Sequence, residues 1–293
     1  MAGQLKEVRN RIKSVQSTQQ ITKAMKMVSA AKLRRAQDAI IQMRPYARKL
    51  QELLSNIVSN SEGGEGMSLA TERPVEKVLF IVITSDRGLC GAFNANIIKL
   101  AKSTVAVKYE SQFKKGNVTV WNIGKKGYEH FVKNKYHADA TYKDIFQNLT
   151  FENVQKAAQA AMKAFEEKQF DVVEMVYSQF RNAATQKFEV ERFLPIPKVE
   201  KKAGTAKADF IYDPAKEILI AELMPKILNT QLYKAVLDSN ASEHGARMTA
   251  MDKASENANE MLRTLKISYN RARQAAITTE LTEIVSGAAA LQG

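Results

Sequence analysis

The stretch LKEVRNRIKSVQSTQQITKAMKMVSAAKLRRAQDAIIQM, residues 5–43, decides the expected fold, because its apolar residues recur alternately every three and four positions. This spacing is the heptad pattern of a coiled-coil helix. The pattern continues and predicts one helix over residues 3–58, far longer than a globular domain requires. The positions of this N-terminal seam are Leu5, Val8, Ile12, Val15, Gln19, Thr22, Lys26, Ser29, Leu33, Ala36, Ile40, Met43, Ala47, Leu50, Leu54 and Ile57.

The N-terminal seam becomes polar between Gln19 and Ser29. Here Ile21, Met25 and Val28 carry the apolar character one position out of phase. An offset of this kind rotates the apolar stripe and locally changes the supercoil. We therefore expect the stripe to rotate around the helix in this segment.

A second three-four pattern runs from Pro214 almost to the C-terminus. Because an apolar seam is not stable in water, the two terminal helices are expected to bury their seams on each other. The compact segment between them favours an antiparallel pairing. The positions of this C-terminal seam are Leu223, Ile227, Thr230, Lys234, Leu237, Ala241, His244, Met248, Met251, Ser255, Ala258, Leu262, Leu265, Tyr269, Ala272, Ala276 and Thr279.

The middle of the chain has a different period. Its first strand-like run, residues 78–84, is continuously apolar and β-branched, which is typical of a buried parallel strand. Strands alternating with helices predict a small Rossmann-like α/β domain with a mostly parallel sheet. The further strands are expected at 118–123, 138–142, 171–177 and 188–194, and the helices at about 93–112, 125–135 and 151–168.

These patterns together predict an α+β chain in which an α/β domain is inserted into a long antiparallel coiled coil. The expected parts are an N-terminal coiled-coil helix at 1–60, the α/β domain at 74–197 and a C-terminal coiled-coil helix at 208–293.

Charge is concentrated at the N-terminal end of a chain whose net charge is +13. Residues 1–60 carry 12 Lys and Arg against three acidic residues, a net charge of +9. This imbalance indicates an anionic partner, which can be a nucleic acid, a membrane surface or an acidic protein face. No apolar run is long enough to span a bilayer, and the first residues lack a signal-peptide pattern, so we expect membrane contact only through partners.

The sequence offers no constellation for chemistry of its own. The loop 85–94 follows a buried strand, where nucleotide-binding folds hold phosphates, but it contains only two glycines and no complete fingerprint, so a structural turn is favoured. Cys90, the single cysteine, is expected to be a buried thiol rather than a nucleophile. The pairs Glu166–Glu167 and Glu189–Glu191 are expected on solvated faces. One cysteine and three scattered histidines exclude a disulfide framework and a zinc site.

The last 25 residues are unusual for a paired helix. Thr279, Glu283 and Ser286 place polar groups at the seam, beyond the reach of the N-terminal helix by roughly 25 Å. A single helix that is polar and small-sided all round is unstable alone. We therefore expect another protein to enclose this end.

Four blocks of the chain resemble the γ subunit family of F-type ATP synthases in its bacterial form. The last of them is the family's signature near the C-terminus, and with the helix–α/β–helix order the resemblance extends from residue 1 to 293. The blocks are Ile21-Thr-Lys-Ala-Met-Lys-Met-Val-Ser-Ala-Ala-Lys-Leu-Arg-Arg35, Ser85-Asp-Arg-Gly-Leu-Cys-Gly-Ala-Phe-Asn94, Ser242-Glu-His-Gly-Ala-Arg-Met-Thr-Ala-Met251 and Ile277-Thr-Thr-Glu-Leu-Thr-Glu-Ile-Val-Ser-Gly287.

The resemblance implies a central stalk that passes through the α3β3 hexamer of F1 and stands on the c-ring of Fo, with the ε subunit beside it. Its implied function is to couple ion-driven rotation of the c-ring to conformational changes of the catalytic β subunits, in ATP synthesis and in reverse pumping. It implies no active site, cofactor, metal or nucleic-acid partner. The implied location is peripheral, on the cytoplasmic face of the bacterial inner membrane, and membrane association occurs only through the complex.

Particular residues match functional positions of that family. Arg247 matches the arginine that couples the two helices, and Tyr212 and Asp213 match the foot near the c-ring and ε. The residues implied to contact the β subunits or to brace the shaft are Met25, Lys26, Arg34, Arg35, Arg247, Arg273, Gln274, Thr278, Glu280, Thr282 and Glu283.

Two alternatives from other functional classes remain open at the level of sequence. A basic coiled-coil protein that binds nucleic acid predicts strongly salt-dependent binding, although residues 1–45 contain no aromatic residues for base stacking. A nucleotide-dependent enzyme in the α/β domain predicts that the isolated chain binds ATP.

Overall fold

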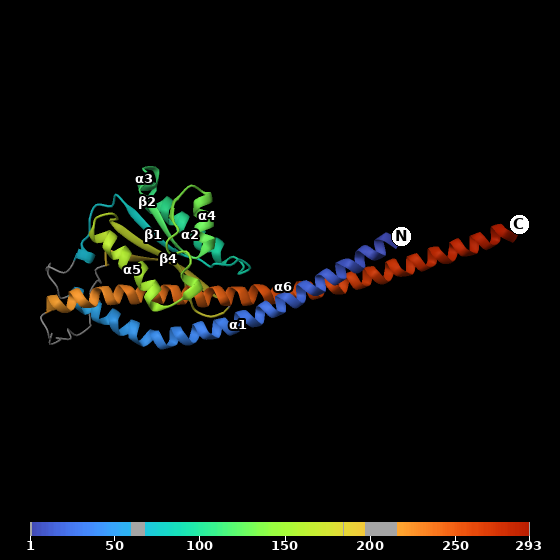
Figure 1. Ribbon diagram of the computed structural model, residues 1–293, viewed down its shortest axis with the longest axis horizontal. Helices are drawn as coiled ribbons and strands as arrows, with labels where there is room; N and C mark the ends of the chain where they lie inside the picture. The colour runs from blue at the N-terminus through green and yellow to red at the C-terminus, as the bar shows by residue number, and fades with distance from the viewer. Residues whose placement is uncertain (1, 60–67, 184, 197–215, 293) are drawn as a thin grey trace. The chain divides into compact units, whose positions relative to one another are not determined.

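The computed structural model describes residues 2–59, 68–183, 185–196 and 216–292 and divides the chain into two compact units. The coiled-coil unit comprises Met1–Ser29 and Met248–Gly293, and the sheet unit comprises Ala30–Arg247. Helices α1 (Ala2–Ser59) and α6 (Lys216–Gln292) contribute to both units (Figure 1). Residues 208–215, which the sequence assigns to the C-terminal helix, lie outside the described residues.

In the coiled-coil unit, α1 and α6 pair antiparallel. Arg9 donates a hydrogen bond to Tyr269, and Thr22 lies against Ser255, so moving forward along α1 corresponds to moving back along α6. The predicted seam is confirmed, since its described positions are buried or half-buried while their neighbours are mostly exposed. Ala258 and Leu262, for example, are buried.

The predicted rotation of the apolar stripe is wrong. Thr22 and Ser29 remain in the seam with exposures of 8% and 3%, whereas Ile21 and Val28 lie outside it, each 57% exposed. The reason is polar pairing, because Thr22 finds a hydrogen-bonding partner across the seam in Ser255. A satisfied polar group can remain buried at modest cost, so α1 keeps its register and exposes its apolar residues.

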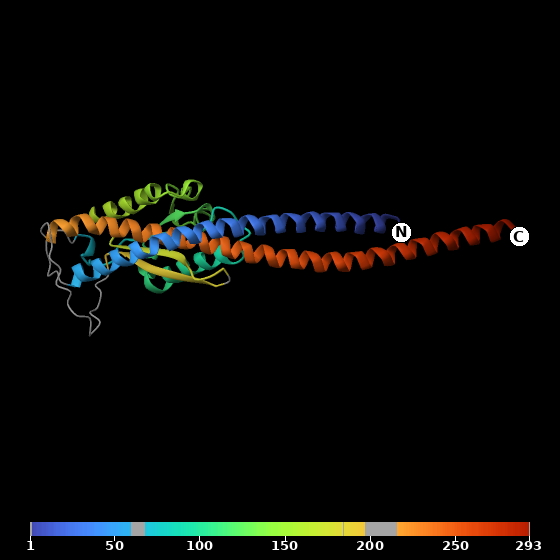
Figure 2. The ribbon, with the colours of Figure 1, turned by 90° about the horizontal axis from the view of Figure 1, so that it is seen from below.

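Helix α6 extends past the start of α1 within the coiled-coil unit. Ala2 lies seven residues before Arg9, whereas Gln292 lies 23 residues beyond the paired Tyr269. The difference of 16 residues corresponds to about 24 Å of helix. Figure 2 shows α6 continuing beyond the end of α1.

The sheet unit is built on five strands in the order β3-β2-β1-β4-β5. The four strands from β3 to β4 are parallel and β5 is antiparallel, which confirms the mostly parallel α/β prediction. A direct turn joins β4 to β5, and so short a connection permits only antiparallel pairing. The strand bounds are β1 Val78–Ile83, β2 Val118–Ile123, β3 His137–Asp139, β4 Val172–Phe180 and β5 Gln186–Leu194.

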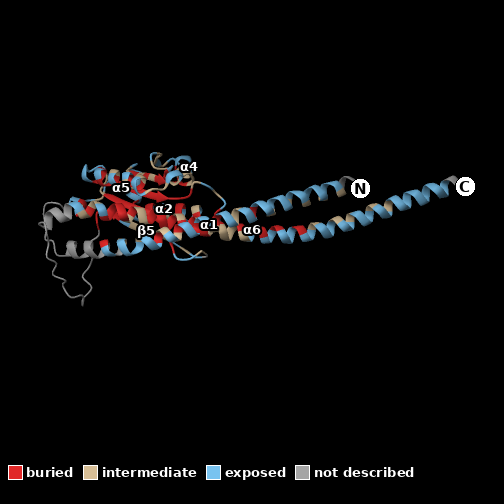
Figure 3. Ribbon diagram, turned by 60° about the horizontal axis from the view of Figure 1, so that its bottom comes forward, coloured by how far each residue is buried: buried red, intermediate tan, exposed pale blue. Residues whose placement is uncertain are grey.

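Helices cover both faces of this sheet. Alternate residues of β1 face opposite cores, because side chains alternate along a strand. Phe80 belongs to the core beneath α2 and α4, and Ile81 belongs to the core beneath α5 and the part of α6 that includes Leu228. Figure 3 shows the buried residues of this unit gathered around the sheet. The remaining helices are η1 Ser68–Ala70, α2 Phe93–Lys108, α3 Glu110–Lys114, α4 Lys125–Lys133, η2 Ile145–Asn148 and α5 Phe151–Glu166. Among the described helices, none is long and apolar enough to cross a membrane.

Candidate functional site

The end of α6 is exposed, but the prediction that it is polar and small-sided all round is wrong, because large apolar side chains lie on its surface. We define the α6 tip as residues 273–290. Ile277, Leu281, Ile284 and Val285 are 49–68% exposed there. The hydroxyl groups of Thr278 and Thr282 donate to backbone carbonyls four residues earlier, at 3.0 and 2.8 Å, so their hydrogen-bonding capacity is partly used within the helix. The side chains that sequence reasoning placed at this end are exposed; they are Arg273, Gln274, Thr278, Glu280, Thr282 and Glu283.

A second exposed surface lies on α1. Ile21, Met27 and Val28 are each more than half exposed, and Met25 is half-buried. Sequence reasoning missed this surface, because it assigned Ile21 and Val28 to the rotated seam. The signal that could have found it is that Thr22 and Ser29 already occupy heptad positions, which leaves these apolar side chains outside.

The basic residues predicted on α1 lie in different environments. Lys26 Nζ lies 2.5 Å from Asp252 Oδ1 of α6, and both side chains are almost half exposed. Arg34 and Arg35, in the sheet unit, are exposed. Lys26 therefore forms an ion pair between α1 and α6, whereas the positively charged side chains of Arg34 and Arg35 are exposed to solvent.

Arg247 differs from the other predicted contact residues because it is buried, with an exposure of 8%. Its Nη2 donates to the carbonyl oxygen of Arg87 at 2.9 Å, and its Nη1 donates to Glu243 Oε1 at 2.7 Å. Burial raises the pKa of Glu243, and the Arg247 charge opposes this shift. Burial, together with the charges of Arg247 and Lys32, lowers the pKa of His244 to about 4.

The loop after β1 is closed by its own side chains. Ser85 and Asn94 exchange hydrogen bonds, with Ser85 N 2.9 Å from Asn94 Oδ1 and Asn94 Nδ2 2.7 Å from Ser85 Oγ. Cys90 is only 1% exposed and its sulfur lies beside both side chains, which confirms the buried thiol. The geometry is that of a structural turn.

The expectation of solvated carboxylates holds for only one of the two pairs. Glu166 and Glu167 are exposed. Glu191 is half-buried and accepts hydrogen bonds from Tyr177 at 2.8 Å and from Gln231 of α6 at 2.7 Å, so the prediction for it is wrong. The reason is that α6 packs on the sheet at this point, which strand periodicity alone does not reveal.

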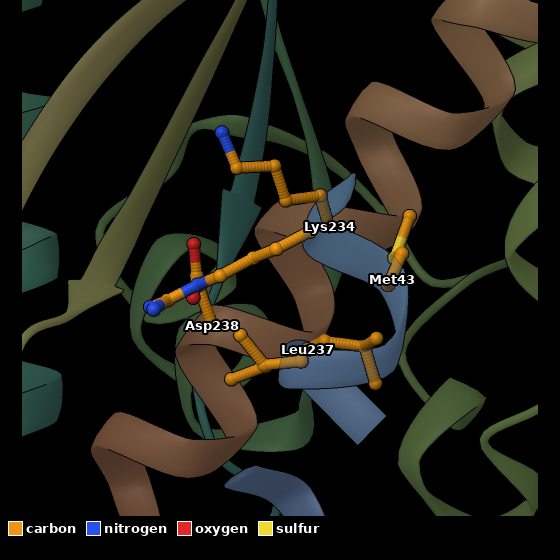
Figure 4. Close-up of a pocket in the computed structure, with 6 residues that line it drawn as sticks. Met43, Lys234, Leu237 and Asp238 are labelled. Atoms are coloured by element: carbon orange, nitrogen blue, oxygen red, sulfur yellow. The ribbon is translucent and has the colours of Figure 1, made fainter. Parts of the chain in front are cut away.

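A small pocket lies between α1 and α6 in the sheet unit (Figure 4). Asp238 lines it, is 3% exposed, and has a buried Oδ1 without a hydrogen-bonding partner. Burial raises the pKa of Asp238 to about 6, although the charges of Lys234 and Arg44 and a hydrogen bond from the Phe180 backbone oppose the shift. The other lining residues are Ile40, Met43, Arg44, Lys234 and Leu237. Within the described part of the chain, no group of three His, Cys, Asp or Glu side chains could hold a metal ion.

Tyr212 and Asp213, the predicted foot, lie outside the described residues. The remaining predicted residues fall into two exposed surfaces, on α1 and at the α6 tip, and one buried position, Arg247.

Comparisons with known proteins agree over nearly the whole chain. Residues 4–291 match a family model described as ATP synthase. The chain is 53% identical over 290 residues to the ATP synthase gamma chain of Cytophaga hutchinsonii, covering 98% of each chain, and 49% identical to that of Chlorobaculum tepidum, covering 98% of this chain and 99% of the relative. Among solved structures, the rotor of the Euglena gracilis mitochondrial ATP synthase shares the fold, with a TM-score of 0.66, 19% identity, and coverage of 94% of this chain and 100% of that chain. The chain belongs to the ATP synthase gamma chain family.

Proposed function

We propose that this chain is the central-stalk rotor of an F1Fo ATP synthase. It couples ion-driven rotation of the c-ring to sequential conformational changes of the catalytic β subunits, and it transmits torque in reverse when ATP hydrolysis drives pumping. Family membership supports this function. The observation that carries it is the α6 tip, whose apolar residues remain exposed beyond the end of α1. An enclosing α3β3 hexamer supplies the cover that this tip requires.

The proposed mechanism is mechanical. A pair of helices has no threefold symmetry, so each β subunit of a surrounding ring meets a different face of the rotor. Each catalytic site is then held in a different state, and turning the rotor exchanges these states. By linkage, nucleotide binding must bias the rotor angle as much as the rotor angle biases nucleotide affinity.

The two exposed surfaces are the proposed contacts with the β subunits. On α1 the surface combines Met25 and its exposed apolar neighbours with Lys26, and in the sheet unit Arg34 and Arg35 add positive charge. At the α6 tip the proposed contacts are Arg273, Gln274, Thr278, Glu280, Thr282 and Glu283. Because exposed ion pairs contribute only about 0–1 kcal/mol each, torque is spread over many contacts.

The remaining parts of the proposal concern the assembly. The chain is a non-catalytic subunit, and ATP chemistry takes place in the β subunits. Tyr212 and Asp213 form the foot toward the c-ring and ε. The chain is peripheral, on the cytoplasmic face of the bacterial inner membrane, and is held there by the complex.

Cysteine accessibility tests the proposed enclosure of the tip. Leu281→Cys introduces a thiol at a position that is 57% exposed, while the native Cys90 is 1% exposed and should not react. We expect maleimide to modify the new thiol rapidly in the isolated full chain and at least tenfold more slowly in the assembled complex. Val107→Cys, at an 84% exposed position of α2, is the control and should react at similar rates in both. Equal rates for Leu281→Cys would overturn the proposal.

A further inference from the structure

The loop between β1 and α2 presents two backbone carbonyl groups to Arg247 of α6. Arg87 O accepts hydrogen bonds from Ser85 Oγ at 2.7 Å and from Arg247 Nη2 at 2.9 Å. Gly88 O accepts from the Nε and Nη2 atoms of Arg247, at 3.3 and 3.2 Å. Two carbonyl oxygens that converge on one point bind a cation, whereas phosphate sites at the equivalent place in nucleotide-binding folds use amide donors.

The guanidinium of Arg247 is held on its other side by α6 itself. Glu243, 7% exposed, accepts from Nη1 at 2.7 Å, and His244 Nδ1 lies 3.4 Å from the same nitrogen. The depressed pKa of His244 keeps its ring neutral at pH 7, and in the tautomer that carries its proton on Nε2 the Nδ1 atom accepts from Arg247. Carboxylate, imidazole and two carbonyls together match the planar fork of donors that only arginine offers.

The same loop also accepts hydrogen bonds from the backbone at the start of α4. Asp86 Oδ1 accepts from the Lys125 backbone N–H at 3.2 Å, and Ser85 O accepts from Lys126 N–H at 3.1 Å, both in the first turn of α4. The loop therefore joins α6, through Arg247, to α4.

A second, independent contact brings α6 close to the same edge of the sheet. A Cβ atom at Gly245 would lie 3.2 Å from the backbone of Ala183, in the turn between β4 and β5. A larger side chain there would push the helix away, so α6 touches the turns that follow both β1 and β4. Gly245 allows α6 to lie close to the β4–β5 turn, and the hydrogen bonds of Arg247 fix the position of α6 relative to the β1–α2 loop.

We propose that the β1–α2 loop is an internal guanidinium receptor, which binds Arg247 where related α/β folds bind a phosphate and so latches α6 to the edge of the sheet. A buried ion pair is a weak source of stability, because desolvation offsets the attraction. The contribution of these contacts is to orientation. The two fixed carbonyl oxygens of Arg87 and Gly88 accept hydrogen bonds from a guanidinium in only one orientation. A mechanical consequence, that the latch transmits torque between the sheet and α6, rests on the proposed function.

Hydrogen exchange with chemical rescue tests the receptor in the full chain. Arg247→Ala removes the guanidinium and should accelerate exchange at the loop amides 87–94 at least tenfold, with β4 unchanged as an internal reference. Methylguanidinium at millimolar concentration should restore exchange to within about threefold of the unsubstituted chain. Methylammonium, which carries the same charge without the planar fork, should not restore it. Arg263→Ala, an exposed arginine of α6, is the matched control and should leave the loop unchanged.

Two results would overturn the receptor. One is unchanged loop exchange in Arg247→Ala, and the other is equal rescue by methylammonium. If Arg247→Ala also accelerates exchange in β4, Arg247→Lys decides the matter. It keeps the charge but loses the fork, and it should accelerate the loop at least threefold with β4 unchanged; an unchanged loop in this variant refutes the proposal.

The torque consequence is measured in the reconstituted complex. Arg247→Ala should lower the ratio of pumping to ATP hydrolysis several-fold, and methylguanidinium should raise it again. If the unsubstituted complex pumps and the variant pumps equally well despite a loosened loop, the torque role is refuted while the proposed function stands. If the unsubstituted complex shows no coupling, it is the proposed function that fails.

Discussion

Thr22 Oγ1 of α1 and Ser255 Oγ of α6 lie 2.8 Å apart inside the seam of the coiled-coil unit, where paired heptad positions are normally apolar. Both residues are buried, at 8% and 5% exposure. Each hydroxyl also lies within hydrogen-bonding distance of a carbonyl of its own helix, Gln19 O for Thr22 and Met251 O for Ser255. Because each hydroxyl has one hydrogen, one of the two donates across the seam while the other donates to its own helix. This polar pair holds α1 in a register that leaves Ile21 and Val28 outside, and so it creates the apolar surface proposed to contact the β subunits.

Removing one hydroxyl of this pair should cost more than removing both. Thr22→Val should lower the free energy of unfolding by about 1 kcal/mol, because it leaves Ser255 without its partner. Adding Ser255→Ala should recover part of the loss, since two apolar groups then face each other. Urea titration followed by helix content measures the cycle. Thr18→Val, at an exposed position, is the control and should change stability little. A double variant that loses the sum of the single losses would contradict this account.

The ion pair of Lys26 and Asp252 should contribute little by itself. Both side chains are almost half exposed, and exposed pairs typically contribute about 0–1 kcal/mol. A double-mutant cycle with Lys26→Ala and Asp252→Ala should therefore give a coupling energy below about 1 kcal/mol that shrinks in high salt. A larger coupling that persists at high salt would show that solvent does not screen the pair.

Asp238 and His244 should impose opposite pH dependences on stability in the same range. Asp238 has its pKa raised from 3.8 to about 6, so its unfolded form loses a proton first, and stability falls as pH rises from about 4 to 6. His244 has its pKa lowered from 6.5 to about 4, so its unfolded form gains a proton first, and stability falls as pH drops through the same range. The two effects largely cancel in the unsubstituted chain.

Single substitutions should separate these effects. Asp238→Asn should stabilise the chain at pH 7 by about 2–3 kcal/mol, the equivalent of about two pKa units. Its stability should then rise from pH 4 to 6.5, because only the histidine effect remains. His244→Gln should show the reverse slope. Urea midpoints at pH 4.5, 5.5 and 7 provide the measurement, and a flat profile in both variants would refute the assignment.

Local periodicity predicted most of the fold. The seams of α1 and α6 follow from spacings of 3.5, and the strands follow from apolar runs. β1 and β2 lie within one residue of the predicted bounds, whereas β4 ends three residues later and β5 begins two residues earlier than predicted. The antiparallel pairing of the helices follows from the compact segment between them. β3, at His137–Asp139, is shorter than predicted because only three residues pair with β2. The antiparallel direction of β5 depends on the length of a turn, which the pattern of strands did not specify.

The parts that sequence reasoning missed all depend on contacts between residues distant in the chain. Thr22 keeps its place in the seam because of Ser255, and Glu191 is half-buried because Gln231 of α6 reaches it. Arg247 binds carbonyls of the loop at Arg87, 160 positions away. No local pattern encodes such partners, so the buried latch emerges only from the three-dimensional structure. The exposed surface on α1 was within reach of the sequence, since Thr22 and Ser29 occupy heptad positions, but only the contact with Ser255 shows why they stay there.

Proton pumping by a reconstituted complex containing Ala258→Pro tests the central claim most directly. Ala258 is buried in the seam between α1 and α6, and a proline inside a helix costs about 3 kcal/mol or more and bends it. Ala258→Ser, which keeps the backbone hydrogen bond, is the matched control and should pump nearly normally. If the paired helices transmit torque, the proline complex should assemble and hydrolyse ATP but pump few or no ions. Unimpaired pumping by the assembled Ala258→Pro complex would contradict the account.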